Sequence, residues 1–249
     1  MLLVTARLTG MFLVAPVYSH KVLPVRLRVG LALAVAVAVL GRLAQPVAMP
    51  ADVVALALAV GIEAGLGAAI GYAACLLFVG VELGAAHVGQ QIGIGLRGVI
   101  ASQGAGGSHP VGMLFRLVAL VTFLAIGGHR DMMAAMLTSF KTVPLGAVVS
   151  PEALGGLVVG LLSMSFVLAL QVAAPVLIAL LLATVALGFL QKTIPQCHVL
   201  STDPPIRALL GLLVLAVSVA AVVALVEGAW GRSAQAIGDF VRTTSWSRP

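Results

Sequence analysis

Two glutamates stand inside long apolar runs of this sequence, and each lies between glycines four residues apart. Glu63 is the central residue of GIEAG (61–65), and Glu82 is the central residue of GVELG (80–84). A carboxylate at bilayer depth costs roughly 2.5 to 3.5 kcal/mol, so each acid must be protonated, paired or in contact with water. The chemistry that these residues could provide is a polar path or an interhelical contact. A glutamate that reaches water near the membrane interface is the alternative.

The glycines around the acids belong to a spacing that recurs along the middle of the chain. Residues four apart share a helix face, and small ones there form a groove for another helix backbone. The pairs are Gly61–Gly65, Gly67–Gly71, Gly80–Gly84, Gly89–Gly93 and Gly156–Gly160. Gln90 and Gln91 stand beside one pair, and adjacent helical residues point about 100° apart. The two amides therefore fit contacts with different partners, or a segment that lines water.

A glycine-rich polar stretch, GIGLRGVIASQGAGGSHP (93–110), follows the two glutamines. It is not a phosphate-binding loop, because it lacks the G-x-x-x-x-G-K-[ST] pattern and no strand-like segment precedes it. A loop of this composition between membrane helices is either a gate or a loose connection.

The sequence offers no catalytic or metal-binding motif. It has no HExxH, and its five histidines show no ligand spacing. Ser108 and His109 are adjacent but lack the G-x-S-x-G frame of a hydrolase. Cys75 and Cys197 form no CxxC motif. We therefore expect neither an enzyme nor a cofactor.

The composition indicates the class of protein that must position these groups. Hydrophobic residues make up 61% of the 249 residues and charged residues only 9%, whereas a soluble domain is about a quarter charged. This predicts an all-α integral membrane protein. The net charge of +6 is not interleaved with aromatics as a nucleic-acid surface would be, so it is expected to hold loops at a lipid surface.

Apolar runs bounded by charge or proline predict the membrane segments. They cover 1–18, 29–49, 53–80, about 81–100, 112–128, 154–190 and 206–227. A spanning helix needs about 20 residues, so 154–190 is expected to be two spans or a hairpin broken near Pro175. The positive-inside rule places both the 19–28 loop and the C-terminus in the cytoplasm, which six simple spans cannot satisfy. A broken or re-entrant segment would resolve this conflict, and so would a protein that does not simply cross a bilayer.

Four stretches in order resemble one family, the FliR component of the flagellar protein export gate and its SctT-type virulence-secretion relatives. The stretches are FLVAPVYSHKVLPVRLRVGLAL (12–33), VELGAAHVGQQIGIGL (81–96), IGGHRDMMAAMLTSFKTVPLG (126–146) and APVLIALLLATVALGFLQKTIPQCHVLSTDPPIRALLGLLVL (174–215). The similarity extends over nearly the whole chain. Three features depart from the family pattern: Ser102-Gln103 replaces Asp-Pro, His198 stands where relatives have Asn, and the first span is short.

The resemblance implies a single export-gate domain over 1–249, built of bent helical hairpins that stack in a multi-subunit complex. It implies a structural and gating subunit, with sister P and Q components and the B component as partners, in the inner membrane at the flagellar basal body. Unfolded flagellar proteins would pass through it, and lipids would surround it. By position, it assigns the pore plug to Ser102, Gln103, Gly104, Ala105, Gly106, Gly107, Ser108, His109 and Pro110.

In this interpretation partner chains accommodate Glu63, Glu82, Gln90 and Gln91, and the glycines let partner helices come close. Two other functions stay open. One is a virulence injectisome subunit, and the other is a self-sufficient small-solute transporter in which the two acids bind protons or cations at broken helices.

Overall fold

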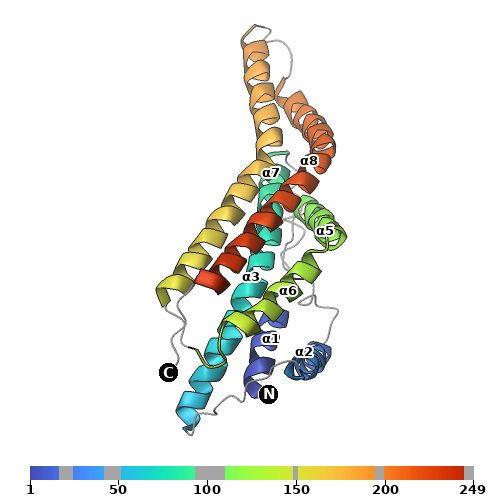
Figure 1. The fold of residues 1–249 in the computed structure, drawn as a ribbon. Helices are drawn as coiled ribbons and strands as arrows, with labels where there is room; N and C mark the ends of the chain where they lie inside the picture. Colours follow the sequence, from blue (N-terminus) through green and yellow to red (C-terminus); the bar gives the residue numbers. More distant parts are fainter. Residues whose placement is uncertain (17–24, 42–51, 93–109, 148–150, 194–198, 244–249) are drawn as a thin grey trace. The chain divides into compact units, whose positions relative to one another are not determined.

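The structure is a computed structural model, and it describes residues 1–16, 25–41, 52–92, 110–147, 151–193 and 199–243. In these ranges every regular element is an α-helix, which confirms the predicted all-α class. The helices are α1 (Leu2–Val14), α2 (Val25–Leu40), α3 (Val53–Ile92), α5 (Pro110–Ala125), α6 (Gly128–Thr142), α7 (Pro151–Thr193) and α8 (Val199–Thr243) (Figure 1).

The long helices correct two predictions from the sequence. The runs 53–80 and 81–100 are not separate spans, because α3 runs without interruption from Val53 to Ile92. The expected break near Pro175 is also wrong, since this proline lies inside the continuous 43-residue helix α7. A proline removes one backbone hydrogen bond, and helices in apolar surroundings tolerate that loss when the rest of the ladder is intact.

The bend that the structure does contain lies between α5 and α6. Their axes meet at 63°, and the break is short enough for the pair to count as one broken span. Gly127 at the break has φ of +78°, a left-handed conformation that glycine adopts without steric cost. His129 follows directly in the first turn of α6, so the GGHRD stretch (127–131) lies at a helix boundary.

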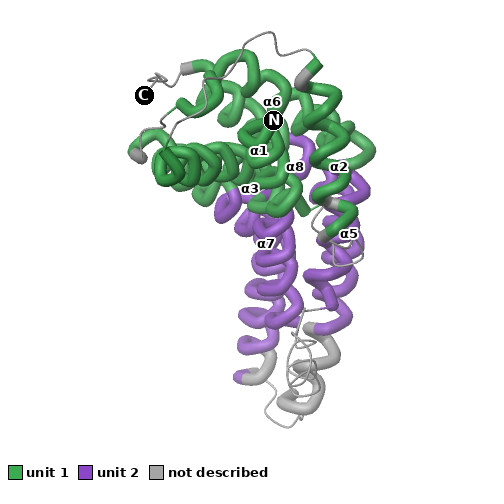
Figure 2. The backbone as a smooth tube through the Cα atoms, turned by 90° about the horizontal axis from the view of Figure 1, so that it is seen from below, with its two compact units in different colours: residues 1–76, 124–164, 230–249 green, residues 77–123, 165–229 purple. Residues whose placement is uncertain are grey.

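The chain divides into two compact units, and the division falls inside α3, α5, α7 and α8 (Figure 2). Unit 1 consists of Met1–Leu76, Leu124–Met164 and Trp230–Pro249. Its core forms where α1 packs on the first half of α3, with Leu8, Met11 and Phe12 at most 2% exposed. In this unit α2 lies beside α1 (Figure 1).

Unit 2 consists of Leu77–Phe123 and Ser165–Ala229. The ring of Phe78 on α3 meets the ring of Phe123 on α5 edge to face, with centroids 5.5 Å apart. The second half of α3 also packs closely on α7, where Gly80 lies against the backbone of Ser165. Aromatic and small-residue contacts of this kind hold helices together without polar groups.

Candidate functional site

The buried acid of unit 1 is paired with an arginine of the first helix. Arg7 on α1 donates from Nε to Oε2 of Glu63 on α3 at 2.5 Å, and both side chains are 0% exposed. Glu63 is thus neutralised inside its own chain. The expectation that partner chains accommodate this acid is wrong, because the compensating charge was already present 56 residues earlier in the sequence.

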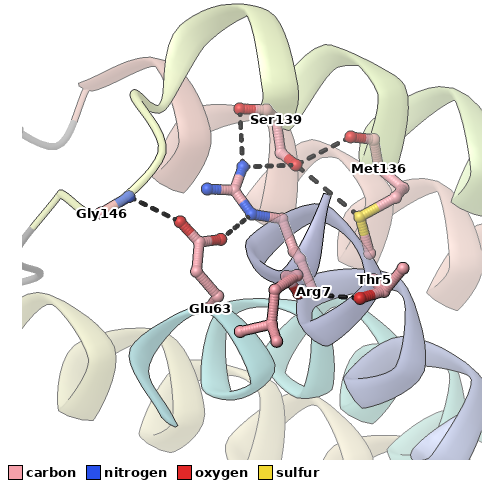
Figure 3. A network of polar contacts seen from close by, with 7 residues as sticks. Thr5, Arg7, Glu63, Met136, Ser139 and Gly146 are labelled. Carbon is pink, nitrogen blue, oxygen red and sulfur yellow. Dashed lines mark hydrogen bonds and ion pairs between the residues drawn. The ribbon is translucent and has the colours of Figure 1, made fainter. Parts of the chain in front are cut away.

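Arg7 Nη1 and Glu63 Oε1 bind the end of α6 and the turn that follows it, while the buried Arg7 Nη2 has no hydrogen-bond partner among the described residues (Figure 3). Arg7 Nη1 donates to the backbone oxygen of Ser139 at 3.1 Å and lies 3.3 Å from its hydroxyl oxygen. Oε1 of Glu63 accepts the backbone N–H of Gly146 at 2.8 Å. The guanidinium carbon of Arg7 also lies 4.8 Å from the ring centroid of Phe140, which suits a cation–π contact. One ion pair therefore joins α1, α3 and α6.

Close backbone contact between α1 and α3 brings the two charges together. A Cβ on Gly67 would collide with the carbonyl oxygen of Arg7, and one on Gly71 would lie 2.7 Å from the carbonyl oxygen of Met11. Gly10 of α1 lies equally close to the backbone of Ala64. Glycine is needed at these positions because any side chain would push the helices apart.

The glycines on either side of Glu63 do not take part in this contact. Gly61 and Gly65 are exposed, and a Cβ at either would meet nothing within 4 Å in the described part of the chain. Contact within this chain thus uses Gly67 and Gly71 instead. A role for Gly61 and Gly65 in packing against another chain stays a prediction.

The second acid has a different environment. Arg116 on α5 donates from Nη1 to Oε2 of Glu82 at 3.2 Å, with the two side chains 48% and 31% exposed. Gly80 and Gly84 beside it are buried against the α7 backbone at Ser165 and Ala169. The GVELG glycines therefore pack a helix within unit 2, while Glu82 stays partly open.

The amides that were predicted to meet partners or water lie near the end of α3. Gln90 and Gln91 are both exposed there, and Gly89 is buried. Gly93 lies outside the described residues, as do Ser102 to His109 of the predicted plug. Pro110, its last residue, is the first residue of α5. The plug assignment stays a prediction from the resemblance.

Arg7 is the functional candidate that the sequence analysis missed. A single arginine in an apolar run needs a polar partner, and an acid in another apolar run can be that partner. That rule pointed to Glu63 or Glu82 but could not choose between them. A further contact was also missed, in which Trp230 Nε1 on α8 donates to Oδ2 of Asp131 on α6 at 3.1 Å.

The structure and the composition together define an integral membrane protein. In the ranges described, three helices are long and apolar enough to cross a bilayer, or four if the bent α5–α6 pair counts as one. The same ranges contain no cluster of three His, Cys, Asp or Glu side chains that could hold a metal ion.

A family comparison gives the particular kind of membrane protein. The model for bacterial export proteins, family 1, matches residues 1–233, so the chain belongs to this family. The FliR resemblance is thereby confirmed, and the chain is a membrane component of bacterial protein export.

Curated relatives agree with this assignment. The flagellar biosynthetic protein FliR of Bacillus subtilis is 23% identical over 243 residues, covering 96% of this chain and 93% of that protein. FliR of Pectobacterium carotovorum is 26% identical over 152 residues, which is 58% of this chain and 56% of the relative. FliR of Caulobacter vibrioides is 27% identical over 117 residues, 47% of each chain.

Proposed function

We propose that this chain is a structural and gating subunit of the flagellar type III export channel. With sister P and Q subunits it forms the pore through which unfolded flagellar proteins cross the inner membrane, and the B component binds at the closed entrance. The flagellar system is preferred to the injectisome because the relatives described above are named as flagellar proteins.

The observation that carries the proposal is the length of exposed apolar helix. On α7 the exposed apolar side chains extend from Val159 to Phe189. At 1.5 Å per residue this stretch is about 45 Å long, and a tilt of about 40° still leaves about 34 Å along the membrane normal. The hydrocarbon core of a bilayer is only about 30 Å thick. Lipid alone therefore does not cover the apolar surface of α7 from end to end.

The described part of the chain does not cover the three candidate spans either. In the most apolar 18-residue stretch of each helix, only 28% to 33% of the residues are buried. On α7 the side chain of Val159 is 63% exposed and that of Phe189 is 70% exposed. The apolar surface that lies beyond the lipid needs other protein surfaces, and this need supports a subunit of a larger assembly.

The state of the two acids argues against the transporter alternative. A proton or cation site needs a carboxylate that a wet path can reach. Glu63 is fully buried and already neutralised by Arg7, and Glu82 is paired with Arg116. Glu63 cannot serve as such a site in this conformation, and the part-exposed Glu82 would first have to separate from Arg116.

The proposal is tested by an in-frame deletion of the gene in the source bacterium, complemented by a tagged copy. We expect the deletion to abolish filament proteins in the culture medium. The tagged chain should leave mild detergent in one complex with two further small membrane proteins, the P and Q subunits. A chain that purifies alone, in a strain whose filament export survives the deletion, would refute the proposal.

A further inference from the structure

The segment between α6 and α7 contains a tight turn whose shape is set by one glycine. Ala147 N–H donates to the carbonyl oxygen of Pro144 at 3.2 Å, which closes a four-residue turn. Gly146 is its third residue and has φ of +81°. This combination is a type II turn, in which the third position requires a positive φ.

The turn leaves one backbone donor of its own unused, and that donor is held by Glu63. The N–H of Gly146 does not take part in the closing hydrogen bond of the turn, and it donates instead to Oε1 of Glu63 at 2.8 Å. Ala147 and the preceding Val143 are each 1% exposed, and the three residues between them are part-buried. An N–H that is partly removed from water and has no acceptor is costly, so the carboxylate oxygen of Glu63 stabilises this turn.

Arg7 binds the part of the chain just before this turn, where α6 ends. It donates to the carbonyl oxygen of Ser139, which also accepts the N–H of Val143 at 2.9 Å as α6 ends. A cation at the last carbonyls of a helix is favourable electrostatically. The two members of one ion pair thus hold two consecutive parts of the chain, namely the end of α6 and the turn after it.

We propose that Arg7 and Glu63 are positioning residues for the connection from α6 to α7. Arg7 fixes where α6 ends, and Glu63 fixes the turn through its hydrogen bond with Gly146. The inference rests on the geometry of unit 1 alone and does not depend on the proposed function. It also explains why the pair is ionic, because two apolar side chains of similar size could fill the space but could not bind either backbone group.

The test compares two double variants that differ in a single acceptor. Both remove the buried charges together, which avoids leaving one charge unpaired. Arg7→Met/Glu63→Gln keeps an oxygen for Gly146, and Arg7→Met/Glu63→Leu does not. Each is made in the full chain with Cys75 and Cys197 replaced by alanine.

The readout is the rate at which a maleimide modifies a thiol introduced by Ala147→Cys, in membranes that hold the intact protein. We expect slow labelling in the parent, a rate within threefold of the parent in the Gln variant, and a rise of at least tenfold in the Leu variant. The exposed position Thr142→Cys lies at the end of α6, where both doubles lack Arg7, and as the control it should label at one rate in the two doubles. Unchanged labelling in the Leu variant, or equally fast labelling in both doubles, would overturn the proposal.

If neither double variant accumulates, hydrogen exchange of the unmodified chain decides the matter. The backbone N–H of Gly146 should then exchange at least tenfold more slowly than the same amide in an unstructured peptide. Exchange at the unstructured rate would overturn the proposed link between Glu63 and the turn.

Discussion

Replacing Gly67 by alanine is expected to separate α1 from α3. A Cβ at this position would lie 2.7 Å from the carbonyl carbon of Arg7 and 3.1 Å from the backbone nitrogen of Met11, and closer still to the Arg7 oxygen. These are backbone atoms, so no side-chain rotation relieves the contact and the whole of α1 must shift. We therefore take the upper end of the usual cost of overpacking, about 3 kcal/mol.

Gly65→Ala provides a matched control two residues away on the same helix. Gly65 is exposed, and its added Cβ would meet nothing within 4 Å. Alanine stabilises a helix interior by about 1 kcal/mol relative to glycine, and this gain is common to both variants. The difference between them should thus reflect the clash alone, which is about 3 kcal/mol.

The assay is a thermal melt of the full chain in mild detergent, followed by the loss of its monodisperse size-exclusion peak. For a chain of this length about 1 kcal/mol corresponds to about 2 to 4 °C in Tm, so Gly67→Ala should melt about 6 to 12 °C below Gly65→Ala. Equal melting temperatures, or a higher one for Gly67→Ala, would refute the close contact between α1 and α3.

Three further predictions follow from other parts of the chain. Gly84→Ala should lower the Tm relative to Gly188→Ala, because only the first Cβ meets a neighbouring backbone, that of α7; equal values would contradict the packing in unit 2. Glu82→Ala should leave the helix content measured by circular dichroism unchanged, since a part-exposed ion pair contributes at most about 1 kcal/mol, while lowering the yield of the export complex; a normal yield would argue against a packing role. Deletion of Gly104–Ser108 should make cells leak ions if this loop is the plug, and unchanged permeability would count against that assignment.

The helices could be predicted from the sequence, but their lengths could not. Apolar runs located the helical segments, because a chain in lipid must satisfy its backbone hydrogen bonds internally. The apolar runs were then divided into spans of about 20 residues, which is the length of a helix that crosses a bilayer once. The helices α3 and α7 are far longer than one crossing, and Pro175 did not end α7.

For the candidate site, the need of Glu63 for a partner could be predicted from the sequence, but the identity of that partner could not. Burial cost alone showed that Glu63 needed a partner, but the partner is distant in sequence and periodicity carries no information on such pairs. The glycine pairs posed the same difficulty. Gly61–Gly65 and Gly67–Gly71 have the same spacing, yet an offset of six residues turns them about 120° apart on a helix. The sequence alone does not tell which of the two faces meets α1.

The arginine in α1 has a consequence for how the chain enters a membrane. The apolar helix α1 carries the charge of Arg7 near its centre, which is costly in lipid without a partner. The ribosome must add 56 more residues before the neutralising acid exists, which takes roughly 3 to 11 s at ordinary rates of synthesis. We therefore expect α1 to reach its final place only after α3, which carries the neutralising acid, has been synthesised.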